Sequence, residues 1–239
     1  MNRRVAAAVA LLYVAIQTFQ WYVFSKLPET EDPVISLMQG PLPLNIARAA
    51  TMLLSFFGLA YLFLVVCGIA FRRRPGLAIA AFLGFFIFCL LEIQLRSVEL
   101  FWVYLDLPRR YQAATTAPEQ ARVLEAQATF QAVQHALYFP LGLSWLIGSV
   151  LVFLALGDAR LDWLARWAFG LNAGRLALRM LDSYVLGPRF DTLYGNLYLP
   201  LVFLTFVPLA IWLKLSAARD TDPTRRPAPV DDPEPIAKH

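Results

Sequence analysis

The chain alternates long apolar stretches with short polar segments, and these stretches predict its main elements. Six of them reach or approach the ~20 residues that a helix needs to cross a bilayer. They cover about residues 5–24, 47–71, 76–105, 137–156, 161–186 and 197–213. We therefore predict an all-α integral membrane protein, a six-helix transmembrane bundle within residues 1–216. Residues 217–239, rich in proline and charge, are predicted to form a disordered cytoplasmic tail.

The fifth stretch allows two interpretations. Arg175, Arg179 and Asp182 make its insertion into a bilayer marginal. It either spans the membrane or lies along the inner surface as an amphipathic helix, which would leave five spans and an external tail. The pair Gly170 and Gly174 favours a packed span, because small residues let helices approach closely.

The segment before the fourth stretch carries a helix-start signal. Thr116, followed by Ala, Pro and Glu119, reads as a capping box with proline in the first turn. No helix breaker follows before residue 139, so this helix is predicted to start well outside the membrane and run into the fourth span. The third stretch also overshoots its outer boundary. Spans three and four should therefore extend outside the membrane as an antiparallel helical hairpin, turned at residues 106–116.

Basic residues predict the orientation. With the N-terminus inside, twelve lysines and arginines flank the spans on that side and six, including Arg48, on the other. The positive-inside rule then places both termini in the cytoplasm. Candidate interfacial aromatic anchors are Trp21, Tyr22, Trp102 and Tyr104 on the outer side, and Trp163, Trp167 and Trp212 on the inner side. Arginine outnumbers lysine by 18 to 3, which is typical of GC-rich bacterial genes, so we expect a bacterial cytoplasmic (inner) membrane.

Composition supports this class and excludes others. The chain is 59% hydrophobic and 16% charged, whereas soluble domains carry roughly 25% charged residues. The net charge of +4 is scattered rather than gathered on one face, so no nucleic-acid binding is expected. Cys67 and Cys89 are interpreted as small apolar residues. Without a zincin-type H-E-x-x-H helix or a second histidine outside the tail, no metal and no cofactor is predicted.

Charged residues inside the apolar stretches are the strongest functional signal. Two sets have the spacing i, i+4, i+7, which places the members of each set on one helix face. A charge in hydrocarbon costs several kcal/mol unless it is paired or hydrated, so such residues usually face a bundle interior or a cavity. Counting along the spans places them in the outer half of the bundle, with His135 at the mouth of the fourth span. The candidate ligand-binding residues are Glu92, Arg96, Glu99, His135, Arg175, Arg179 and Asp182.

Three interpretations of these residues stay open. In the first, Glu92–Arg179 and Arg96–Asp182 are structural ion pairs. In the second, the residues line an outward-facing polar pocket that binds or helps to move a small molecule or lipid. In the third, the protein is an enzyme acting on a lipid or isoprenoid, with Glu92 or Glu99 as general acid/base. Glu99 has no arginine at equal depth and is the candidate for a functional carboxylate. The expected partner is the lipid bilayer, and the oligomeric state is left open.

A family resemblance covers residues 111–182. A long helix, the fourth span, the link from Arg160 to Leu164 and a glycine-containing fifth span follow one another. This order resembles bacterial six-span membrane families known only as domains of unknown function. The resemblance implies a fold and a membrane location, and no activity.

Overall fold

Helices form every regular element of the part of the chain that the structure describes. The structure is a computed structural model and describes residues 1–27, 30–157, 161–187 and 189–220. Its helices are α1 (Arg3–Lys26), α2 (Pro33–Gln39), α3 (Pro43–Phe71), α4 (Pro75–Val98), the π-helix η1 (Glu99–Asp106), α5 (Leu107–Ala113), α6 (Ala117–Ala155), α7 (Asp162–Leu181), the π-helix η2 (Asp182–Leu186) and α8 (Asp191–Asp220). The all-helical prediction is confirmed for these residues.

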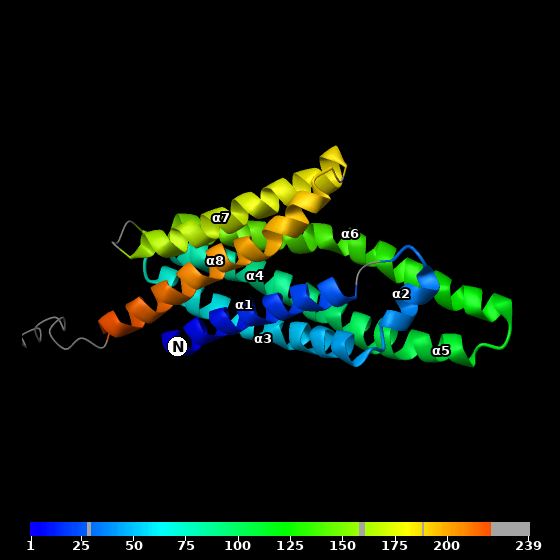
Figure 1. Ribbon diagram of the computed structural model, residues 1–239. Coiled ribbons are helices and arrows are strands. Elements are labelled where there is room, and N and C mark those ends of the chain that lie inside the picture. Colours follow the sequence, from blue (N-terminus) through cyan, green and yellow to red (C-terminus); the bar gives the residue numbers. More distant parts are fainter. Residues whose placement is uncertain (28–29, 158–160, 188, 221–239) are drawn as a thin grey trace, which may run out of the picture.

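The long helices pack as a ring. Its order is α1, α3, α4, α6, α7 and α8, and α8 packs back against α1. Figure 1 shows the start of α1 and the end of α8 at the same end of the bundle, and α5 with the start of α6 projecting at the other end. Consecutive long helices therefore run antiparallel, as short connections require.

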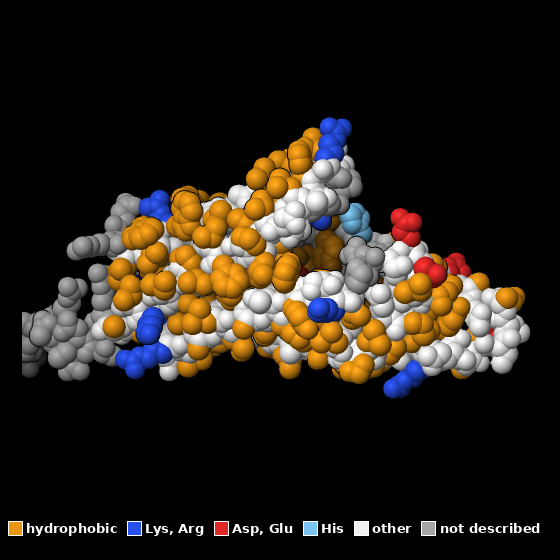
Figure 2. Space-filling view, in the orientation of Figure 1, with side chains coloured by type: hydrophobic (Ala, Val, Ile, Leu, Met, Phe, Trp, Pro, Cys, Tyr) orange, Lys and Arg blue, Asp and Glu red, His pale blue; other side chains and the backbone are white. Residues whose placement is uncertain are grey.

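Among the residues that the structure describes, five helices are long and apolar enough to cross a membrane: α1, α3, the continuous helix from Pro75 to Ala113, α6 and α8. The ring also turns large apolar side chains outward, among them Leu54, Phe57 and Leu83, and Figure 2 shows hydrophobic side chains over much of the bundle face in view. A soluble protein rarely exposes apolar surface this extensive. These features are those of a membrane protein. Helix α7 is not among the five, because its arginines lower its hydropathy.

The interior of the ring is apolar in the half of its length that contains the start of α1 and the end of α8. The rings of Phe63 and Phe85 stack there at 4.0 Å between centroids. Helices α4 and α6 pack closely at Gly84 and Gly148: a Cβ at Gly84 would lie 2.8 Å from the carbonyl oxygen of Ser144. Close helix packing at glycines is therefore found between α4 and α6.

At the end of this half, a polar contact joins three helices. Arg73, in the turn after α3, and Trp212, in α8, both donate to the buried carboxylate of Asp162 at the start of α7, the indole over 3.1 Å. Trp212 is fully buried, so its prediction as an interfacial anchor was wrong. The indole is held by Asp162 instead of by the lipid interface.

The opposite end contains the predicted capping box. The Glu119 side chain accepts from the backbone N–H of Thr116 at 3.1 Å, and α6 begins at Ala117 as expected. The turn is shorter than predicted, because helix continues through η1 and α5 to Ala113. A short helix, α2, also forms in the proline-rich segment after α1, started by an Asp32 cap.

The C-terminal boundary differs from the prediction as well. Helix α8 continues to Asp220, past the predicted start of the tail at residue 217. Residues 221–239, where the rest of the tail was predicted, lie outside the described residues, and so does Arg160 in the link before α7.

Candidate functional site

The charged residues of α4 lie on one inward face, as their spacing predicts. Arg96 donates from Nε to Glu92 at 3.1 Å and from Nη1 to the Oε2 atom of Glu99 at 2.7 Å. Both glutamates are buried. Arg96 therefore pairs with the two acids of its own helix segment, one turn before and one turn after it.

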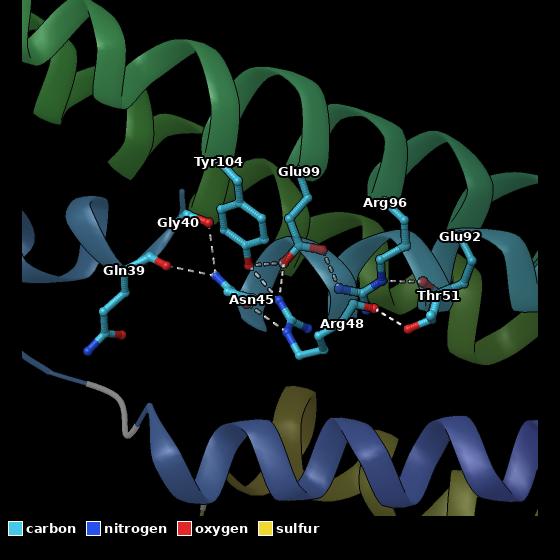
Figure 3. A network of polar contacts seen from close by, with 9 residues as sticks. All are labelled: Gln39, Gly40, Asn45, Arg48, Thr51, Glu92, Arg96, Glu99 and Tyr104. Carbon is cyan, nitrogen blue, oxygen red and sulfur yellow. Dashed lines mark hydrogen bonds and ion pairs between the residues drawn. The ribbon is translucent and has the colours of Figure 1, made fainter. Parts of the chain in front are cut away.

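A second arginine completes this cluster and was not among the predicted site residues. Arg48 in α3 is 2% exposed, although the prediction counted it among the flanking basic residues of the outer side. Its Nη2 atom lies 3.8 Å from the Oε1 atom of Glu99 and donates to the hydroxyl of Tyr104 at 2.9 Å. That hydroxyl donates to Glu99 Oε1 at 2.6 Å (Figure 3). Arg48, Glu92, Arg96 and Glu99, here called the charge cluster, together have no net charge.

The π-helix explains why Tyr104 reaches Glu99. The two residues are five apart, a separation that places them on different faces of an α-helix. In a π-helix the hydrogen bond runs from i to i+5, so residues five apart lie over one another. Tyr104 was predicted as an interfacial anchor, and this was wrong. Its hydroxyl is a member of the polar network.

Asn45 sets the orientation of Arg48. Its side-chain oxygen accepts from Arg48 Nε at 2.8 Å, and its amide nitrogen donates to the carbonyl of Gln39 at 3.2 Å (Figure 3). The end of α2 is thereby joined to the charge cluster. The spacing Asn45-x-x-Arg48 on one helix face is the sequence signal that indicates this pair.

The arginines of α7 have different surroundings. Arg175 donates from Nη2 to Asn172 at 2.9 Å, and Asn172 donates to Ser149 at 2.9 Å. The Arg175 guanidinium lies over the rings of Trp145, at 5.2 Å, and Tyr198, at 6.0 Å. Among the residues that the structure describes, no carboxylate lies within ion-pair distance of Arg175.

Asp182 pairs within its own segment. Its carboxylate lies 3.8 Å from Arg179 and accepts from the backbone N–H of Arg189 at 3.1 Å. The predicted cross-helix pairs Glu92–Arg179 and Arg96–Asp182 are therefore wrong. The physical reason is the ring order: α6 lies between α4 and α7, so each set finds its counterions locally.

His135 lies outside the polar interior. It is exposed on α6, its ring is 5.6 Å from the ring of Tyr184, and its carbonyl accepts from that hydroxyl at 2.9 Å. Neither His135 nor Asp182 borders the cavities described next. In the described part of the chain, no group of three or more His, Cys, Asp or Glu side chains could hold a metal ion.

Two adjoining cavities open within the ring near its hairpin end. The first, the cluster cavity, has a volume of about 560 Å³ and is bordered by Arg48, Glu99 and the amides of α1 and α6. The second, the Arg175 cavity, has a volume of about 730 Å³. Gln20, Phe24, Arg96 and Tyr138 border both cavities. Figure 2 shows the surface hollowed between the end of α1 and the start of α8, two of the segments that line the Arg175 cavity.

The walls of the Arg175 cavity combine cations, tyrosines and apolar side chains. It is lined by Arg96, Arg175 and Arg179 and by Tyr138, Tyr194 and Tyr198. Trp21, Phe24, Leu176 and Leu201 supply apolar surface, and none of its described lining residues is acidic. Of the seven predicted residues, Arg96, Glu99, Arg175 and Arg179 thus line a cavity, while Glu92 contributes through Arg96.

Comparison with protein-family models, with curated proteins and with solved structures found no match for this chain. The resemblance of residues 111–182 to six-span families stays an expectation. Conclusions about function rest on the chemistry of the two cavities.

Proposed function

We propose that this chain is a multi-pass membrane protein that binds, or helps to move, an amphiphilic small molecule or lipid. The observation that supports the proposal is the pair of adjoining cavities, of about 560 Å³ and about 730 Å³. Ligand pockets commonly have volumes of ~300–1,000 Å³ and a mostly apolar lining with a few placed polar groups. The Arg175 cavity has this combination.

We also propose a placement in a bacterial cytoplasmic membrane, with α7 as a sixth span. Its polar residue Asn172 is buried, whereas Trp163, Trp167 and Leu178 are exposed on its outer side, as in a helix that faces lipid. Figure 1 shows α7 running along α6 rather than across the end of the bundle. In this placement both termini are cytoplasmic, the hairpin of α5 and α6 stands outside, and the cavities face the outer side.

The charge cluster does not favour an enzyme. A general acid or base needs a carboxyl group that is free to exchange a proton with a substrate. Glu92 and Glu99 are both bonded to Arg96, and Glu99 also to Tyr104. These contacts favour a structural role for the cluster. That role does not account for the Arg175 cavity, whose arginine has no acidic partner among the described residues.

Two glycines offer a matched test of the binding site. A Cβ added at Gly195 or at Gly174 would meet no atom within 4 Å, so both positions accept a side chain. Gly195 lines the Arg175 cavity and Gly174 does not. We expect Gly195→Phe to fill the cavity and Gly174→Phe to leave it unchanged.

The measurement is binding of tritiated hexadecanoic acid and tritiated hexadecan-1-ol to protein in dodecyl maltoside, with native mass spectrometry of co-purified lipid. Wild type and Gly174→Phe should bind, and Gly195→Phe should fall to the background of protein-free micelles. Equal binding by all three proteins, or by none, would contradict a ligand site in this cavity.

A further inference from the structure

Among the described residues, counting the charges of the interior identifies one arginine without a counterion. The sequence suggests three acids against three arginines, but Arg48 adds a fourth cation. Arg48 and Arg96 are neutralised by Glu92 and Glu99, and Arg179 has Asp182 at 3.8 Å. Within the residues described, the positive charge left over is that of Arg175.

The Arg175 side chain is held in place without being neutralised. Asn172 accepts from its Nη2 atom, Ser149 fixes Asn172, and the rings of Trp145 and Tyr198 lie against the guanidinium. Its Nε atom is buried and has no hydrogen-bond partner. A buried donor without a partner and a charge without a counterion are both costly, and a bound oxyanion would satisfy both.

The other residues that line the Arg175 cavity indicate which chemical group is attached to the anion. Trp21, Phe24 and Leu201 line the same cavity as Arg175 and provide apolar surface. Gln20, in the wall shared with the cluster cavity, has a buried amide oxygen without a partner, so the wall also presents an unused acceptor. A planar guanidinium matches carboxylate and phosphate oxygens in a two-point geometry.

We infer that the Arg175 cavity takes an anionic amphiphile, with its carboxylate or phosphate on Arg175 and its hydrocarbon part against Trp21, Phe24 and Leu201. This inference rests on the proposed function and specifies its ligand class. The anionic group acts as the counterion that the described residues do not supply. Neutral amphiphiles of equal chain length fit the cavity but leave Arg175 unpaired.

The test compares four probes in competition with tritiated hexadecanoic acid, on protein in dodecyl maltoside. The probes are hexadecanoic acid, hexadecyl phosphate, hexadecan-1-ol and inorganic phosphate. On wild type, both anionic amphiphiles should compete about tenfold or more better than the alcohol, the ratio expected for one charge-assisted hydrogen bond. Arg175→Gln should reduce them to the level of the alcohol, and Arg175→Lys, which keeps the charge, should restore part of the difference.

Arg122→Gln is the control for net charge, because Arg122 is exposed on α6 and lies outside both cavities. It should retain the wild-type preference. Arg175→Gln should also lower the unfolding temperature of ligand-free protein less than Glu99→Gln does, since it breaks a hydrogen bond and two ring contacts but no ion pair.

The outcomes separate the inference from the proposed function. Equal competition by acid and alcohol, both blocked by Gly195→Phe, would overturn the anionic assignment while leaving the binding site. An unchanged preference in Arg175→Gln would also overturn it. Inorganic phosphate competing as well as hexadecyl phosphate would mean that the site takes a free anion, and the amphiphile assignment would fail. Binding that is insensitive to Gly195→Phe would overturn the proposed function itself.

Discussion

Glu99→Gln should strongly destabilise the protein. The Glu99 carboxylate accepts from Arg96 at 2.7 Å and from Tyr104 at 2.6 Å, and lies 3.8 Å from Arg48. Counting along the spans predicted no arginine at the depth of Glu99, and for an unpaired carboxylate this substitution would be nearly neutral. The structure contradicts that expectation, because the carboxylate is buried between two guanidinium groups.

The size of the effect follows from the charges that remain. Glutamine keeps one acceptor oxygen and places an NH₂ group toward donors, while Arg48 and Arg96 are left with the single charge of Glu92. Removing one partner of a buried ion pair costs about 3–5 kcal/mol. For a chain of this length, that corresponds to a fall in Tm of about 6–20 °C.

The assay is thermal unfolding of purified protein in dodecyl maltoside, followed by circular dichroism. Glu125→Gln is the control, because Glu125 is exposed on α6. Adding Arg48→Met to Glu99→Gln removes the orphaned cation, so the double variant should lose less stability than the sum of the single variants, by about 0.5–3 kcal/mol. If Glu99→Gln unfolds at the same temperature as Glu125→Gln, the cluster is hydrated and the argument from buried pairs fails.

Two further predictions concern the Asp162 contact, at the end of the bundle that contains the N-terminus, and the membrane placement. Asp162→Ala leaves the indole N–H of Trp212 and the guanidinium of Arg73 without their acceptor, so it should lower the free energy of unfolding by about 1–3 kcal/mol. Adding Trp212→Phe to this variant should then have little further effect. Full additivity of the two losses of stability would contradict a shared contact. In intact cells, a membrane-impermeant maleimide should label Pro118→Cys but not Thr221→Cys, because in the proposed placement only position 118 lies outside. The native Cys67 and Cys89 are buried and should add no background. Labelling of Thr221→Cys would refute the orientation or the number of spans.

The membrane class and most of the helices could be predicted because apolar stretches of this length have few alternatives. The exception is α7. Its inner face carries Asn172 and Arg175, so its hydropathy is low even though its outer face is apolar. Hydropathy averages over both faces of a helix, whereas insertion in a bundle depends on which face meets lipid. Sequence alone therefore left its placement open.

Helix periodicity predicted part of the polar site correctly. Glu92, Arg96 and Glu99 share a face because the chain is regular α-helix up to Val98. Beyond that point the π-helix changes the register, and Tyr104 joins Glu99 at a separation that an α-helical projection assigns to another face. No residue pattern in the segment marks this change, since the side chains between Glu99 and Asp106 are ordinary apolar and aromatic ones.

The burial of Arg48 is a tertiary effect. The residue follows a proline-rich segment and is placed like an arginine that flanks a span at the lipid interface. Its burial depends on the end of α2 packing beside it, which the hydrogen bond from Asn45 to the carbonyl of Gln39 holds in place. That contact joins two elements whose relative position no local pattern determines.

Once Arg48 belongs to the cluster, structural and binding roles fall on different residues. The charge cluster is neutral and hydrogen-bonded, so its members should affect stability more than ligand preference. Arg175 is held by an amide and two rings and lacks a carboxylate among the described residues, so it should affect ligand preference more than stability. Glu99→Gln and Arg175→Gln therefore have opposite expected profiles, although both remove one charge at the same end of the ring. Similar losses of stability in the two variants would mean that Arg175 is part of the same structural network, and the reason for assigning it an anionic ligand would disappear.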